Sequence, residues 1–231
     1  MRRERRLLVA EGEDLVDAAL AAGARPVAML WDEERLADDD PRVAATAGLA
    51  ERYLVPPKLM AQASGLAAAP RVIAIVPQPR PRSFRDVRFP PDVGVYLAGV
   101  ADPGNVGTLV RTADAFGAAV ALSDGCADPL SPKALRASAG AIFRVPLVAW
   151  DVVPGRTVAL AAHGGEPVGE ADLTPPLTFL LGAEREGLPP DLAPGSLTVT
   201  IPLPGEAESL NVAAAGAIAL YEYARRGRPP G

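Results

Sequence analysis

Short apolar runs alternate with helical patterns along most of the chain. Before residue 80, strand-type and helix-type segments follow one another in turn, at 7–10, 13–22, 26–31, 42–50, 53–55, 57–63 and 71–76. Strands that alternate with helices are typical of α/β layer domains. Residues 1–80 are therefore predicted to form a small α/β domain.

The remainder of the chain repeats this alternation with more strongly apolar runs. Strand-type runs lie at 93–100, 118–122, 157–162, 177–182 and 197–201. Helical patterns accompany them at 106–116, 132–138 and 212–226. Continuous apolar strands with helices between them indicate a mostly parallel sheet that helices cover on both faces. We expect this second domain over residues 92–231, after a linker rich in proline and arginine at 81–91.

Composition excludes a membrane span and a disulfide framework. Of 231 residues, 49% are hydrophobic and 22% are charged, as in ordinary globular proteins. No uncharged apolar run reaches the roughly 18 residues of a membrane span. The run Leu7–Ala10 is shorter than the apolar core of a signal peptide. We therefore expect a cytoplasmic protein.

One cysteine, Cys126, and one histidine, His163, limit the chemistry further. They cannot supply the four ligands of the usual zinc site, and no metal is expected. A cysteine nucleophile with a histidine base stays arithmetically possible. Both residues, however, lie in loops beside glycine, without a neighbour that would activate them.

The formal net charge of −5 argues against nucleic-acid binding through the overall field of the protein. Residues 1–90 contain fourteen Lys and Arg and thirteen Asp and Glu. The rest of the chain contains nine Lys and Arg and fifteen Asp and Glu. A polyanion would have to bind to local clusters of positive charge instead. Two arginine clusters exist, formed by Arg2, Arg3, Arg5 and Arg6 and by Arg80, Arg82, Arg85 and Arg88.

Polar residues follow the first strand of the second domain. The segment 102–117, DPGNVGTLVRTADAFG, begins with turn-forming residues and continues as a helix. It places Asn105 at the helix entrance and Arg111 six residues further on. Only Gly104 and Gly107 occupy the loop, so the spacing of a dinucleotide fingerprint is absent and a Rossmann cofactor is a weak alternative.

Two further polar segments follow strands nearer the C-terminus. Residues 181–188, LGAEREGL, place Glu184 in a loop at the end of one strand. Residues 201–215, IPLPGEAESLNVAAA, follow another strand, and prolines flank Leu203, which suits a pocket rim. Ligands of open α/β sheets collect at the carboxyl ends of strands. A ligand pocket is therefore expected where these segments meet.

Taken in order, these three segments resemble the signature motifs of the SpoU/TrmH class of SPOUT RNA 2′-O-ribose methyltransferases. Residues 131–146, SPKALRASAGAIFRVP, are similar to the same family, and the match covers about residues 90–225. The first domain resembles the ribosomal-protein-like RNA-binding module that often precedes this catalytic domain. Ala213 and Ala214 depart from the family, whose members often carry serine and a β-branched residue there.

The resemblance implies a fold, a cofactor and an assembly. The C-terminal segment would be tied into a trefoil knot, and the chain would form a homodimer through its C-terminal helix. The cofactor would be S-adenosyl-L-methionine, bound without metal. The residues implied in its binding are Leu181, Gly182, Ala183, Ile201, Leu203, Ser209 and Leu210.

The resemblance also implies roles in catalysis. Arg111 would act on a ribose 2′-hydroxyl, with Asn105 and Glu184 positioning it. Because arginine is effectively always protonated, we expect it to act as a charged partner of the developing alkoxide. Ser209 and Asn211 would hold the ribose or the methionine end of the cofactor.

The appended domain favours ribosomal RNA over transfer RNA as the substrate. Three alternatives stay open at this point: a transfer-RNA ribose methyltransferase, an RNA-binding protein of the same fold without catalysis, and an enzyme that acts on a substrate other than RNA.

Overall fold

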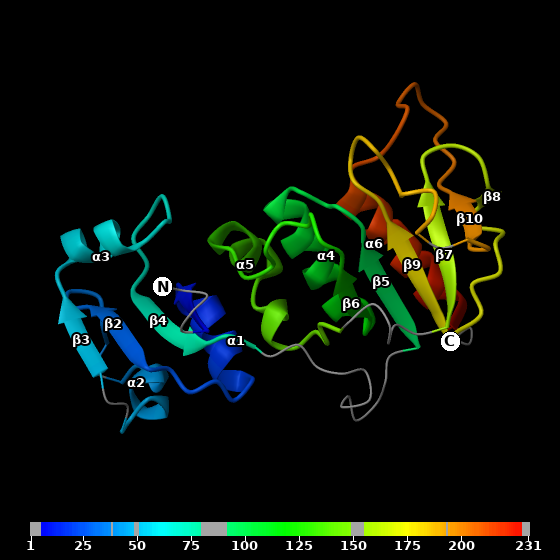
Figure 1. Cartoon of the computed structure of the whole chain (residues 1–231). Coiled ribbons are helices and arrows are strands. Elements are labelled where there is room, and N and C mark those ends of the chain that lie inside the picture. The colour runs from blue at the N-terminus through cyan, green and yellow to red at the C-terminus, as the bar shows by residue number, and fades with distance from the viewer. Residues whose placement is uncertain are drawn as a thin grey trace. The chain divides into compact units, whose positions relative to one another are not determined.

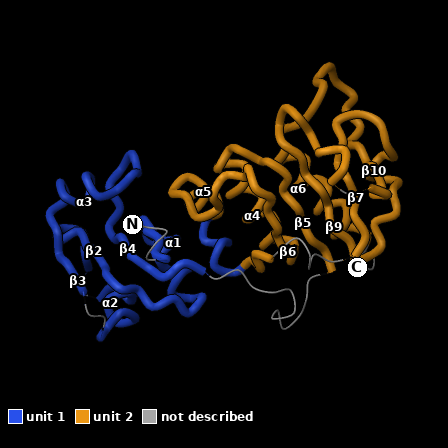
Figure 2. Tube along the Cα trace, viewed as in Figure 1, with its two compact units in different colours: residues 1–79, 139–144 blue, residues 80–138, 145–231 orange. Residues whose placement is uncertain are grey.

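The computed structural model describes residues 6–37, 39–48, 51–79, 92–148, 155–192 and 194–227. The Cα trace divides into two compact units (Figure 2). The first unit comprises residues 1–79 with the short segment 139–144, and the second comprises 80–138 and 145–231. The expected linker 81–91 and every arginine of the two clusters except Arg6 lie outside the described residues.

The first unit is built on a four-stranded sheet in the order β1-β4-β2-β3 (Figure 1). Its strands are β1 (Leu7–Glu11), β2 (Ala28–Asp32), β3 (Glu51–Val55) and β4 (Val72–Pro77). β4 runs antiparallel to β1 and β2, whereas β3 runs parallel to β2. Each strand coincides, within a few residues, with an apolar run from which it was predicted.

The helices of this unit are α1 (Glu13–Ala21), α2 (Pro41–Ala45) and α3 (Pro57–Ala63). The prediction of a helix over 42–50 was wrong in length, because α2 ends at Ala45. The hydroxyl of Thr46 donates to the carbonyl of Arg42 at 2.7 Å, and Gly48 has a φ of +84°. A left-handed glycine directs the chain out of the helix.

The second unit is built on a six-stranded sheet in the order β6-β5-β9-β7-β10-β8. Its strands are β5 (Val93–Leu97), β6 (Ala119–Leu122), β7 (Arg156–Ala161), β8 (Glu166–Pro167), β9 (Leu177–Leu181) and β10 (Leu197–Thr200). All pairings among these described strands are parallel. The expected α/β fold with a parallel sheet is therefore confirmed. The two-residue β8 was not predicted, because it contains no apolar run.

The helices of the second unit begin and end where the sequence supplies caps. Helix α4 (Pro103–Phe116) starts at Asp102, whose carboxylate accepts a hydrogen bond from the Asn105 amide at 3.0 Å. It ends at Gly117 in the left-handed conformation. Helices α5 (Pro132–Ser138) and α6 (Val212–Gly227) follow, and a short 3-10 helix, η2 (Ala141–Phe143), belongs to the first unit.

Small residues let α6 approach the sheet closely. A Cβ atom added at Gly216 would lie 2.5 Å from a methyl carbon of Leu109 in α4 and 2.8 Å from one of Leu181 in β9. Helices α4 and α6 therefore pack on the face to which Leu181 points. On the opposite face, Tyr96 and Leu180 belong to an apolar cluster that the partly buried side chains of loop residues complete.

Strand order brings distant segments together. β9 inserts between β5 and β7, and β10 lies on the far side of β7. Because these strands are parallel, their carboxyl ends meet at one edge of the sheet. The loops that follow β9 and β10 therefore come together at that edge. The order departs from the order along the chain, and the trefoil knot stays a prediction.

Gly107 of α4 provides a test of this packing. Its added Cβ would lie 2.3 Å from the Ala134 carbonyl oxygen and 2.7 Å from the Ala137 Cβ in α5. Alanine favours helices by about 1 kcal/mol over glycine, yet we expect Gly107→Ala to lower the free energy of unfolding by about 1–3 kcal/mol through overpacking. Urea unfolding, monitored by circular dichroism, measures this free energy of unfolding. Thr108→Ala, on the exposed side of the same helix, is the control and should change stability by less than about 0.5 kcal/mol. A Gly107→Ala protein as stable as the wild type would contradict the packing.

Candidate active site

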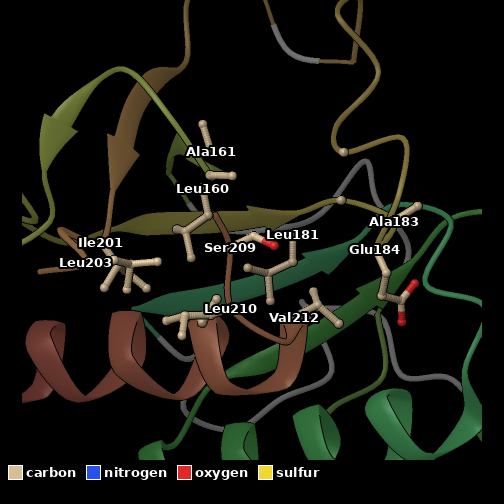
Figure 3. Close-up of a pocket in the computed structure, with 14 residues that line it drawn as sticks. Leu160, Ala161, Leu181, Ala183, Glu184, Ile201, Leu203, Ser209, Leu210 and Val212 are labelled. Atoms are coloured by element: carbon tan, nitrogen blue, oxygen red, sulfur yellow. The ribbon is translucent and has the colours of Figure 1, made fainter. Parts of the chain in front are cut away.

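A pocket of about 150 Å³ lies at the carboxyl-terminal edge of the parallel sheet (Figure 3). It is walled mainly by apolar side chains that come from β9, from the segment after β10 and from the start of α6. The lining residues are Leu160, Ala161, Ala162, Leu181, Gly182, Ala183, Glu184, Gly187, Ile201, Leu203, Ser209, Leu210, Val212 and Ala215. Apolar walls with a few polar groups at the rim suit a small organic ligand.

The loop after β9 forms one side of this pocket and depends on glycine. The amide of Ala183 donates to the Gly187 carbonyl at 3.1 Å, and the Gly187 amide donates back at 2.9 Å. A Cβ at Gly182 would come within 2.2 Å of the Gly187 backbone, and Gly187 itself has a φ of +69°. The loop is thus folded back tightly, so that its backbone forms the pocket wall.

Two side-chain amides connect this loop to the two long helices. Asn211 Nδ2 donates to Asn105 Oδ1 at 3.0 Å, and Asn105 Nδ2 donates to Glu184 Oε1 at 2.7 Å. The Oδ1 atom of Asn211 also accepts from the amides of Ala213 and Ala214, and so caps α6. We call these bonds the Asn211–Asn105–Glu184 network. It joins residues of all three sequence motifs.

The cap of α4 has a cationic partner that the sequence did not identify as part of the site. Lys133 Nζ lies 2.7 Å from Asp102 Oδ2. This hydrogen bond, with that from the Asn105 amide, lowers the pKa of the Asp102 carboxyl below its ordinary value. The Asp102 carboxyl therefore stays ionised to lower pH than an ordinary aspartate, and as a carboxylate it caps the helix that begins beside it. The helical pattern at 132–138 had indicated the helix of Lys133, but no local signal pointed to its partner.

The predicted cofactor residues converge in the structure. All seven line the pocket: Leu181, Gly182, Ala183, Ile201, Leu203, Ser209 and Leu210. Residues 160–162 at the end of β7 line it as well, and they were not predicted. Local sequence patterns could not predict these residues, because only the pairing of the strands places β7 between β9 and β10.

The predicted catalytic residues divide into two groups. Asn105, Glu184 and Asn211 form the network, and Ser209 lines the pocket beside it. Arg111 lies exposed on α4, and it makes no hydrogen bond or ion pair with another residue that the structure describes. Asn105 and Glu184 are hydrogen-bonded to each other, and the structure shows no hydrogen bond from either of these described residues to Arg111. Their predicted role in positioning Arg111 therefore stays a prediction.

Other chemistries find little support in the described residues. The Sγ atom of Cys126 donates to the Leu97 carbonyl at 3.2 Å, and His163 is exposed in a separate loop. Over the described ranges, His, Cys, Asp and Glu side chains form no group of three that could hold a metal ion. Nor does a helix in those ranges have the length and apolar character needed to cross a membrane.

Comparison with known proteins relates this site to a family. The model of the SpoU rRNA Methylase family matches residues 92–221. Two relatives match both units. A 23S rRNA (guanosine(2553)-2′-O)-methyltransferase of Bacillus subtilis is 31% identical over 91% of this chain and 86% of its own. A 23S rRNA (uridine(2479)-2′-O)-methyltransferase of Streptomyces viridochromogenes is 31% identical over 90% of this chain and 82% of its own.

Solved structures agree with these relatives. The SpoU methyltransferase AviRb from Streptomyces viridochromogenes, in complex with AdoMet, superposes with a TM-score of 0.85 and 29% identity, covering 97% of this chain and 92% of its own. A structure concerning the 2-OH methylation of C/U34 on tRNA matches only 59% of this chain but 97% of its own, with a TM-score of 0.54 and 32% identity. From its matched motifs, its fold and these relatives, the chain belongs to the SpoU rRNA methylase family.

Proposed function

We propose that the protein transfers a methyl group from S-adenosyl-L-methionine to a ribose 2′-hydroxyl of ribosomal RNA. The observation that carries this proposal is the junction of the three motifs. The loops after β9 and β10 enclose an apolar pocket, and the Asn211–Asn105–Glu184 network ties that pocket to the helix of Arg111. A donor site and a cationic acceptor site would thus be held by one set of hydrogen bonds.

The pocket residues fit this cofactor. The side chains of Leu181, Leu203 and Leu210 would sandwich an adenine ring, and the backbone of the folded loop at Gly182 would approach it without side-chain obstruction. When bound, the cofactor supplies an electrophilic methyl group on a sulfonium sulfur. Ser209, at the rim of the pocket, would hold the ribose or the methionine end.

Arg111 would act on the acceptor. The ribose oxygen forms a bond to the methyl group as the methyl–sulfur bond breaks and leaves a neutral thioether. The hydroxyl loses its proton to water, so negative charge develops on that oxygen. A protonated guanidinium stabilises such an oxyanion and can also contact the neighbouring phosphate. Its exposure, without a partner among the described residues, leaves Arg111 available for RNA.

Ribosomal RNA is favoured because of the extent of the matches. The two 23S rRNA methyltransferases align over nine-tenths or more of this chain, which includes the first unit. The transfer-RNA structure aligns over 59% of it.

We propose that the first unit, over residues 1–80, recognises RNA. A ribosomal RNA substrate would place the enzyme in the cytoplasm. The two relatives are named for guanosine and uridine, so the target base is left open.

We also propose a homodimer that packs through α6. Ile218 and Tyr221 expose 39% and 58% of their surface on this helix, whose first turns consist almost entirely of small residues. In sedimentation analysis we expect the wild type at twice the chain mass of 23.9 kDa and Tyr221→Arg near one chain mass. Ala21→Arg, at the end of α1 in the other unit, is the control. A monomeric wild type would contradict this assembly.

Labelled methyl donor, offered with separate pools of ribosomal and transfer RNA, tests the proposed reaction. We expect label in ribosomal RNA and, after digestion, in 2′-O-methylated nucleosides. Label in base-methylated nucleosides, or in neither pool, would contradict the proposal. Label in transfer RNA alone would favour the alternative substrate.

Arg111→Ala tests the acceptor side in the same assay. If Arg111 acts on the hydroxyl, this change should abolish methyl transfer and leave cofactor affinity within about threefold, which is under 1 kcal/mol. Thr108→Ala, one turn earlier on α4, should retain both. An Arg111→Ala protein with normal turnover would remove Arg111 from the mechanism.

Leu210→Arg tests the donor side. A charged side chain in the apolar pocket should weaken S-adenosyl-L-methionine binding at least about 100-fold, or roughly 2.7 kcal/mol. Isothermal titration calorimetry measures it. Ala207→Arg puts the same charge on an exposed position of the same segment, outside the pocket lining, and should bind normally. Equal affinities in the two variants would show that the cofactor binds elsewhere.

A further inference from the structure

The two outer strands of the first unit's sheet differ in burial. β1 alternates, with Leu8 and Ala10 buried and their neighbours half-buried, as expected for an edge strand with one covered face. β3 is exposed at every position except the half-buried Val55. It pairs with β2 on one side, and no described strand covers its other edge (Figure 1). β3 therefore presents both of its faces and one backbone edge to solvent.

Large apolar side chains gather on this strand and on the helix that follows it. Tyr53, Leu54 and Leu59 expose 49%, 63% and 49% of their surface. Met60 is the one buried residue of α3. We call five exposed residues the β3–α3 surface, namely Arg52, Tyr53, Leu54, Lys58 and Leu59, and Glu51 at the start of β3 is exposed beside them. Exposed Leu and Tyr side chains on two consecutive elements make this part of the first unit a candidate contact surface.

Some cations of the first unit are paired with carboxylates, whereas Arg6, Arg25, Arg52 and Lys58 are exposed. Arg35, Arg42 and Arg71 each form ion pairs with carboxylates of the same unit. Arg52 and Lys58 are exposed and form no ion pair with another described residue. Their positive charge is therefore available to an anionic partner.

We propose that the β3–α3 surface binds unpaired nucleotides of the substrate RNA, an inference that rests on the proposed function. Unpaired bases stack on exposed aromatic rings, and flanking cations contact the phosphates. Tyr53 supplies the ring, with Arg52 and Lys58 on either side of it in the chain. Because side chains alternate along a strand, Arg52 and Leu54 lie on one face of β3 and Tyr53 lies on the other. A nucleotide strand that follows the open edge of β3 would reach both faces. The free cations distinguish this partner from a protein strand, which needs no phosphate contact.

Binding of a fluorescently labelled, unstructured oligoribonucleotide to the full-length protein tests this assignment. Tyr53→Ala should weaken affinity at least about fivefold, and Tyr53→Phe, which keeps the ring, should restore it. Arg52→Gln and Lys58→Gln should each reduce the slope of log affinity against log salt by about 0.7. Arg71→Gln is the matched control, since its side chain is also exposed but pairs with Glu13, and should leave the slope unchanged.

Methyl transfer to ribosomal RNA, assayed in parallel, separates this proposal from the reaction itself. If the wild type methylates RNA but Tyr53→Ala binds the oligonucleotide as tightly as the wild type, the β3–α3 assignment is wrong and the proposed function stands. If Tyr53→Ala instead changes only the sedimentation coefficient, the surface is a protein interface and the assignment is equally wrong. A wild type that neither binds nor methylates RNA overturns both.

Discussion

Two side-chain amides hold together the three segments on which the proposed chemistry depends. Asn211 caps α6 and donates to Asn105 at the start of α4, and Asn105 donates to Glu184 in the loop after β9. Each hydrogen bond of this kind contributes about 1 kcal/mol net. We propose that the network acts through geometry and keeps the helix of Arg111 in register with the loops that form the pocket, an alignment on which the proposed methyl transfer would depend.

The sequence predicted what depends on local pattern. Apolar periodicity located the strands, and the order of the three motifs led to the residues around the pocket. Features that arise from long-range packing were missed. Leu160 lines the pocket because β7 lies between β9 and β10, an arrangement that no local pattern contains. The ion pair between Lys133 and Asp102 joins residues from separate helical segments. The early end of α2 depends on the conformation of Gly48, which overrode the helical spacing before it.

The distribution of charge supports the proposal that the first unit takes part in RNA recognition. The protein carries a net charge of −5, so its overall field does not attract a polyanion. Contacts have to be local. In the first unit several arginines are neutralised by carboxylates, and Arg52 and Lys58 keep their charge free of described partners. In the second unit, Arg111 is exposed on the helix next to the pocket. Recognition at one unit and chemistry at the other accord with relatives that span both.

The central claim is that Asn105 and Glu184 act as one unit in alignment, and a double-mutant cycle tests it most directly. The kcat/KM for methyl transfer to ribosomal RNA is measured for the wild type, Asn105→Ala, Glu184→Ala and the double variant. If the hydrogen bond between them is what matters, the double variant should be no worse than the more damaged single variant within about threefold, so that the two losses do not multiply. Losses that multiply would show that the two residues act independently and would contradict the account.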